Sequence, residues 1–191
     1  MVGNTPNYTK VDVLRAFLLL KRRQSRLALT NSLQLGEGTI RSILDILKNK
    51  GLIESNRGGH VLSAKGLQLD RNVQKIITPP KKVEFEEYPN DVKIGLIIKD
   101  ADPHDISPRI RDVAVKNGAD GALIFVYNKH LILPHYEERH YPELEKEFDF
   151  RDGDILIIAF ARDRKSAESG ALAIAVEMSD KLKRILQQIS R

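Results

Sequence analysis

Residues 25–62 read SRLALTNSLQLGEGTIRSILDILKNKGLIESNRGGHVL, the clearest succession of structural signals in the chain. Ser25 is a suitable N-cap for a short helix that ends near Leu33, in which leucines recur one turn apart. A glycine-containing turn at residues 35–38 follows. The next helix begins near residue 39, and its apolar side chains recur at helical spacing: Ile40, Ile43, Leu44 and Leu47. This segment therefore predicts two helices joined by a tight turn.

A hairpin is predicted directly after the second of these helices. Gly51 follows Asn49 and Lys50 and can adopt the left-handed conformation that ends a helix. Residues 52–55 form a candidate strand, residues 56–59 a glycine-containing turn, and residues 60–62 the returning strand.

Two further helices flank this segment. One precedes it, with apolar residues at helical spacing, and one follows from an N-cap at Ser63 to about Ile76. The first half of the chain is thus three helices, a hairpin and another helix. Pro79 and Pro80 end any preceding helix, so we predict one domain over residues 1–80 and a second over residues 81–191.

The second half alternates between strands and helices. Strands are predicted at residues 92–98, 122–126, 131–133 and 154–160, and helices from Ser107 to Gly118 and at residues 141–148. This β-α-β-β-α-β order is that of a ferredoxin-like split βαβ unit, an α/β sandwich, with a C-terminal helix appended. Residues 171–178 fit either a strand or a helix, and the apolar stripe that continues to Ile189 favours a helix. The predicted fold class is α+β.

Charge is distributed unevenly along the chain. Residues 1–82 hold 15 Lys and Arg against 5 Asp and Glu, a balance of +10, whereas the remainder holds 16 against 21, a balance of −5. A basic half joined to an acidic half indicates that only the first contacts a polyanion.

The candidate binding residues lie mainly on the helix that begins near residue 39. If its apolar side is buried, its other side remains available to enter a DNA major groove, where arginine can donate two hydrogen bonds to guanine. An ion pair between Arg41 and Asp45 is the plain structural alternative. Lys21, Arg22 and Arg23 add attraction that does not depend on base sequence. The predicted DNA-binding residues are Arg26, Thr39, Arg41, Ser42, Asp45, Lys48, Arg57, Gly58 and His60.

Three short stretches resemble a known family. Residues 35–44 resemble the start of the recognition helix in bacterial and archaeal winged-helix repressors, residues 50–53 resemble their helix-to-wing junction, and residues 56–60 resemble a short wing. The whole chain resembles a group of archaeal regulators that pair a winged helix-turn-helix with a C-terminal domain of unknown function. The resemblance implies this architecture and a DNA-binding role.

The second half of the chain contains fewer specific signals for a ligand-binding, metal-binding or catalytic site. Arg162, Arg164, Lys165 and Ser166 follow a strand and precede a helix, where Ser166 is the expected N-cap, so they form a candidate site for a small anionic ligand. A solvated charged loop is the alternative. Residues 100–105 contain four potential ligands for a divalent metal, but an acidic loop that caps the next helix is the favoured interpretation. The histidines at 130, 135 and 140 do not share one helix face, so no metal site and no cofactor is predicted. The chain has no cysteine, phosphate loop or nucleophile motif, so no enzymatic activity is predicted.

These observations predict a transcription regulator that binds double-stranded DNA as a homodimer, with the second domain serving dimerisation or the binding of a small anionic effector. The sequence has no apolar segment long enough to cross a membrane and no signal-peptide core, so a cytoplasmic location is expected. The alternatives are an enzyme acting on a nucleotide or another anionic metabolite, with a winged-helix appendage, and a protein-docking module.

Overall fold

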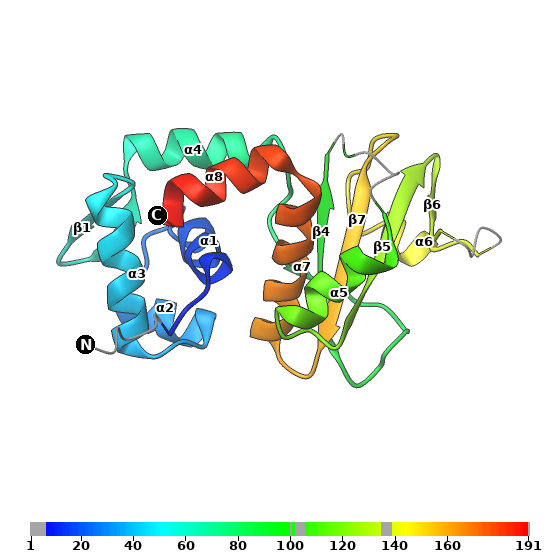
Figure 1. Ribbon diagram of the computed structural model, residues 1–191, viewed down its shortest axis with the longest axis horizontal. Helices are drawn as coiled ribbons and strands as arrows, with labels where there is room; N and C mark the ends of the chain where they lie inside the picture. The colour runs from blue at the N-terminus through cyan, green and yellow to red at the C-terminus, as the bar shows by residue number, and fades with distance from the viewer. Residues whose placement is uncertain (1–6, 100, 102–105, 135–138, 191) are drawn as a thin grey trace. The chain divides into compact units, whose positions relative to one another are not determined.

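The computed structural model describes residues 7–99, 101, 106–134 and 139–190. It divides into two compact units. Unit 1 comprises residues 1–73 together with 184–191, and unit 2 comprises residues 74–183. The fold is of mixed helix and sheet, with a helical N-terminal part and a C-terminal antiparallel sheet (Figure 1).

Unit 1 contains the predicted succession of helices and hairpin. Its elements are α1 (Lys10–Leu19), α2 (Arg26–Leu33), α3 (Glu37–Asn49), β1 (Ile53–Asn56), β2 (Gly59–Leu62), α4 (Ala64–Gln74) and the end of α8 (Asp180–Ser190). The predicted N-caps are confirmed, because the hydroxyl of Ser25 accepts a hydrogen bond from Ala28 N (3.1 Å) and that of Ser63 from Gly66 N (3.1 Å). The predicted turn at residues 35–38 is shorter than expected, because Glu37 and Gly38 already belong to α3.

A buried ion pair within α1 is hydrogen-bonded to the end of α2. The side chain of Arg15 is inaccessible to solvent, and its Nη1 donates to Asp12 Oδ1 (3.1 Å) and to the carbonyl oxygen of Leu33 (3.3 Å). Asp12 also accepts from Thr9 N and so completes a capping box at the start of α1. The pair therefore fixes where α2 ends relative to α1.

Unit 2 is a five-stranded sheet in the order β3-β4-β7-β5-β6. Its elements are β3 (Lys81–Lys82), β4 (Val92–Ile98), α5 (Pro108–Lys116), β5 (Gly121–Asn128), β6 (His130–Ile132), α6 (Pro142–Glu145), β7 (Ile155–Ala161) and α7 (Arg164–Met178). Both β4 and β5 pair antiparallel to β7, so β4, α5 and β5 form a βαβ unit with β7 inserted between its strands. The predicted order of elements is present, and the short strand β6 lies at an edge.

Both faces of this sheet are covered. Helices α5 and α7 lie on one face (Figure 1), and an aromatic cluster around Phe125 and Tyr141 covers the other. Strand β7 is consequently buried along its whole length, which explains why residues 155–161 are almost uniformly apolar.

Two features differ from expectation, the connector after α4 and the C-terminal helix. Residues 76–78 are not a free connector, because Ile77 bridges to Ile98 and Thr78 N donates to the carbonyl of Ile97 (2.9 Å). The segment 171–178 is helical, as favoured, but the helical stripe does not run unbroken to the C-terminus. Helix α7 ends at Met178 and α8 begins at Asp180, and residues 184–191 group with unit 1.

The buried pair in α1 yields a prediction for stability. Arg15→Leu removes the cation and leaves the carboxylate of Asp12 buried without it, a change that costs roughly 3 kcal/mol or more. We expect hydrogen exchange to show a loss of this size in the free energy of opening for amides of α1 and α2. The matched change Arg22→Leu, at an exposed position, should alter it by less than about 0.5 kcal/mol. Equal protection in the two variants would show that the pair does not organise these helices.

Candidate functional site

Helix α3 has one buried and one exposed side. Its four apolar residues at helical spacing, Ile40, Ile43, Leu44 and Leu47, are each 5 % exposed or less. Four of the predicted site residues lie on the exposed side, and Thr39 is half-buried in the first turn. The exposed four are Arg41, Ser42, Asp45 and Lys48.

The C-terminus of α3 is closed by a Schellman motif. Gly51 has φ +66°, its N–H donates to the carbonyl of Lys48 (2.8 Å), and Leu52 N donates to that of Leu47 (2.9 Å). The left-handed glycine predicted from the sequence is thereby confirmed. This cap directs the chain from α3 into β1.

The hairpin is attached to the segment before α2. Gln24 and His60 exchange two backbone hydrogen bonds, of 2.9 and 2.8 Å, so Gln24 extends the β1–β2 ladder by one residue. Gly59 lies at this junction with φ +118°, and a Cβ there would collide with the carbonyl of Gln24. Only glycine fits this close approach.

The turn of the hairpin is organised by Asn56. Its Oδ1 accepts from Gly58 N (2.8 Å) and from Nη1 of Arg23 (2.7 Å). The sequence grouped Arg23 with general basic charge, whereas the structure shows it supporting the turn. Arg57, at the tip, is exposed.

Three predicted residues from different elements converge near the hairpin. His60 is half-buried, and its Nδ1 lies 2.8 Å from the hydroxyl of Ser55. Burial lowers the pKa of His60, and the positive charges of Arg26 and Lys48 lower it further. The start of α2 and the last turn of α3 therefore each place a positive charge near His60 of β2.

The remaining polar groups on and near α3 differ in whether they interact with other parts of unit 1. No ion pair between Arg41 and Asp45 forms within the described part of the chain, so both charged groups face solvent. The hydroxyl of Ser42 donates back to the carbonyl of Gly38 (3.1 Å) and keeps its acceptor lone pairs available. Lys21 lies 3.6 Å from the buried carboxylate of Asp70, so its charge is directed toward α4.

The candidate ligand site in unit 2 differs from expectation at the helix cap. Asp163, not Ser166, is the N-cap of α7, and it accepts from both the backbone N (2.9 Å) and the hydroxyl (2.8 Å) of Ser166. Partial burial raises the pKa of Asp163, but these hydrogen bonds outweigh it and hold the pKa below its usual value. A carboxylate therefore already occupies this helix N-terminus. Arg162 and Arg164 are exposed, and Nε of Arg164 lies 3.8 Å from Glu168.

Within the residues that the structure describes, no helix is long and apolar enough to cross a membrane, and no cluster of three acidic or histidine side chains has metal-binding geometry. Residues 100, 102–105 and 135, considered in the sequence as metal ligands, lie outside the described residues.

Two family models match separate parts of the chain. Residues 9–68 match the model described as PH0730-like, N-terminal domain. Residues 90–178 match the model described as Domain of unknown function (DUF4443). The comparison with curated proteins gave no significant match.

Among solved structures, the chain is similar to the hypothetical protein PH0730 from Pyrococcus horikoshii OT3. The two are 29% identical over 94% of this chain and 100% of that chain, with a TM-score of 0.80, so they share a fold. A further match is to S. agalactiae BusR in complex with its busAB-promotor DNA, at 14% identity over 92% of this chain and 100% of that chain. Its TM-score of 0.27 is too low to support any inference.

The surroundings of His60 yield a prediction that an NMR titration can check. Its imidazole should titrate below the ordinary histidine pKa of about 6.5. Arg26→Gln and Lys48→Gln should each raise the pKa, because each removes a positive charge that opposes protonation. Arg109→Gln in α5 should leave it unchanged. A pKa insensitive to the first two substitutions would mean that the three side chains do not converge.

Proposed function

We propose that unit 1 is a winged helix-turn-helix that binds double-stranded DNA, with α3 as the recognition helix and the β1–β2 hairpin as the wing. The observation that supports this most is the two-sided character of α3. Its apolar side is fully used inside unit 1, while Arg41, Ser42, Asp45 and Lys48 are exposed. The unit's own fold has no need for that polar side.

The exposed side of α3 has the chemistry of base recognition. Arg41 can donate two hydrogen bonds to the O6 and N7 atoms of guanine in the major groove. Asp45, one turn further along, can accept from the amino group of cytosine and would repel phosphate, so it favours a position over base edges. Thr39 and Ser42 can contact bases or backbone, Ser42 as an acceptor.

The surrounding cations provide the phosphate contacts. The wing turn presents Arg57, and its conformation is fixed by Asn56, which accepts a hydrogen bond from the backbone N–H of Gly58. Arg26 and Lys48 lie close enough to His60 to lower its pKa, and a phosphate bound there would be attracted to both cations and would favour the imidazolium. These contacts position the protein on the duplex, whereas α3 distinguishes sequences.

We further propose that the protein acts by binding rather than catalysis, as a cytoplasmic homodimeric transcription regulator. A single module of this size makes few base contacts, and a dimer doubles the recognised site. Unit 2 would serve dimerisation or the binding of a small anionic effector. Its sheet shares with the ferredoxin-like arrangement a βαβ unit that is split by an inserted strand, but the inserted strand is β7, the last in the chain, and β3 and β6 occupy the edges.

The proposed DNA binding should depend on salt concentration and on base sequence. Affinity for a duplex selected from a random pool should fall steeply between about 50 mM and about 200 mM salt, because binding releases counterions. Arg41→Ala should lose roughly 10-fold to 100-fold on the selected duplex and much less on a random one, because it removes a base contact. Arg57→Ala should weaken both duplexes equally and lower the salt slope by about one. Fluorescence anisotropy measures all of these quantities.

Arg109→Ala in α5 is the charge-matched control, since it also removes one exposed positive charge. If it weakened binding as much as Arg41→Ala, the attraction would be general and α3 would not be the recognition helix. Absence of duplex binding in the wild-type chain would favour the protein-docking alternative.

The affinity for DNA should also depend on pH. A phosphate beside His60 favours the imidazolium, so the pKa of His60 should be higher in the complex than in the free protein, where it is lowered. Binding then takes up a proton, and affinity should rise as pH falls from about 7.5 to about 5.5. His60→Gln should flatten this profile. A pH dependence identical in the variant and the wild type would place the phosphate elsewhere.

The number of chains bound to each duplex tests the proposed dimer. Sedimentation of the protein with the selected duplex should give two chains per DNA, and the selected sequence should contain inverted half-sites about one helical turn apart. One chain per duplex on a site without symmetry would rule out the dimer.

A further inference from the structure

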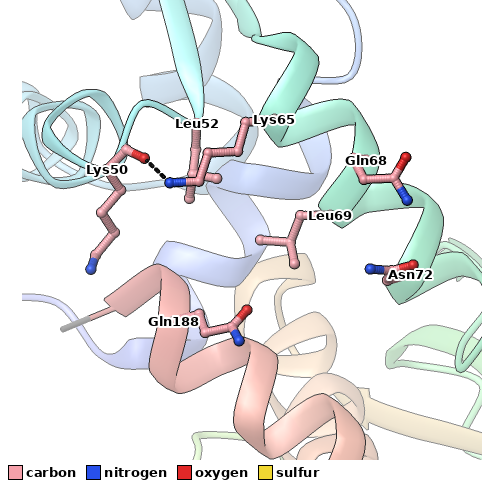
Figure 2. Close-up of a pocket in the computed structure, with 7 residues that line it drawn as sticks. All are labelled: Lys50, Leu52, Lys65, Gln68, Leu69, Asn72 and Gln188. Atoms are coloured by element: carbon pink, nitrogen blue, oxygen red, sulfur yellow. Dashed lines mark hydrogen bonds between the residues drawn. The ribbon is translucent and has the colours of Figure 1, made fainter.

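Unit 1 contains a cavity of about 570 Å³, and none of the residues proposed above to bind DNA is among the described residues that line it. It is bordered by Lys50 and Leu52 after α3, by one face of α4, and by Gln188 of α8 (Figure 2). This volume lies within the range of sites that bind small molecules, roughly 300–1,000 Å³.

The α4 side of the cavity has a regular pattern. Lys65, Gln68, Leu69 and Asn72 occupy positions i, i+3, i+4 and i+7, so they share one face of the helix. Figure 2 shows Leu69 between the polar side chains of this face, and buried Leu52 lies on the opposite border. The cavity thus combines an apolar surface with polar groups around it.

The charge of the cavity is positive. Among the described residues that line it, both ionisable ones are lysines and none is acidic. Nζ of Lys65 donates to the carbonyl oxygen of Lys50 (2.8 Å), which holds this ammonium at the end where Lys50 also lies and leaves it two further donors. An anionic group is the natural partner for that end.

The other end is lined by carboxamides. Gln68 uses its Oε1 to accept from Arg71 (2.8 Å), which leaves its amide N–H groups available. In the part of the chain that the structure describes, the side-chain amides of Asn72 and Gln188 form no hydrogen bond. Carboxamides offer a donor and an acceptor side by side, the arrangement that pairs with the edge of a nucleobase.

We propose that this cavity binds a nucleoside monophosphate, with the phosphate at Lys50 and Lys65, the base edge at the carboxamides, and the base plane against Leu52 and Leu69. The effector was expected from the sequence in the second half of the chain, but this cavity lies in unit 1. Binding itself is independent of the DNA-binding proposal; a regulatory role for it rests on that proposal.

Two of the lining residues belong to helices through which a bound ligand would affect DNA binding. Lys50 is the C-cap of α3, the proposed recognition helix. Gln188 belongs to α8, the helix whose first residues, 180–183, belong to unit 2 and whose later residues belong to unit 1. A ligand held by both residues stabilises the association of the end of α8 with α3 and α4.

Calorimetric titration of the full chain with AMP tests the proposal, with adenosine and inorganic phosphate as separate arms. We expect AMP to bind with a dissociation constant of about 1 mM or less and the other two at least about tenfold more weakly. Lys50→Met should weaken AMP binding about tenfold, the loss of one charge-assisted hydrogen bond. Asn72→Leu and Gln188→Leu should each weaken it about fivefold.

Gln187→Leu is the matched control, because Gln187 is exposed on α8 and does not line the cavity. Unaltered thermal melting of each variant verifies that the fold is retained. The proposal is overturned if no AMP binds, if phosphate or adenosine alone binds as well as AMP, or if the cavity variants bind AMP like Gln187→Leu. Because the titration contains no DNA, its result and that of the duplex-binding assay are independent.

Discussion

The arrangement of unit 1 depends on the burial of one side of α3. Ile40, Ile43, Leu44 and Leu47 together remove a continuous apolar stripe from water, and each side chain of this kind stabilises the fold by roughly 2 kcal/mol. Rotating α3 about its axis would expose that stripe, so its orientation is fixed with its polar side outward. The proposed function follows from this single constraint, because the same rotation sets where Arg41 and Ser42 point.

Several interactions hold the neighbours of α3 in place around it. The buried Arg15 anchors the end of α2, the Schellman cap at Gly51 directs the chain into the hairpin, and Gln24 joins that hairpin to the segment before α2. As a result, the side chains of Arg26, Lys48 and His60 come from three elements to one place. The two cations oppose protonation of His60 in the free protein, and a bound phosphate would favour it; perturbed pKa values of this kind are common at binding sites.

Features determined by neighbouring residues could be predicted from the sequence, whereas features determined by distant contacts could not. The caps at Ser25, Ser63 and Gly51 are local, and the buried side of α3 follows from its own spacing. The burial of Arg15 has no local signature, since an arginine on a helix is ordinarily solvated. The pairing of residues 76–78 and 81–82 with β4, and the return of residues 184–191 to unit 1, depend on long-range contacts. At α7 the sequence favoured Ser166 as the N-cap, but the carboxylate of Asp163, three residues earlier, occupies that position.

The proposed orientation of α3 toward DNA is tested most directly by mapping NMR chemical shifts of the isotope-labelled full chain during titration with the selected duplex. Large changes should occur at the exposed residues of α3, at the wing turn around Arg57 and at the start of α2. The methyl groups of Ile43 and Leu47 should keep their free-protein shifts, because they stay buried. Changes confined to unit 2, or an exposed side of α3 that remains unperturbed while the duplex binds, would contradict the proposed role of this helix.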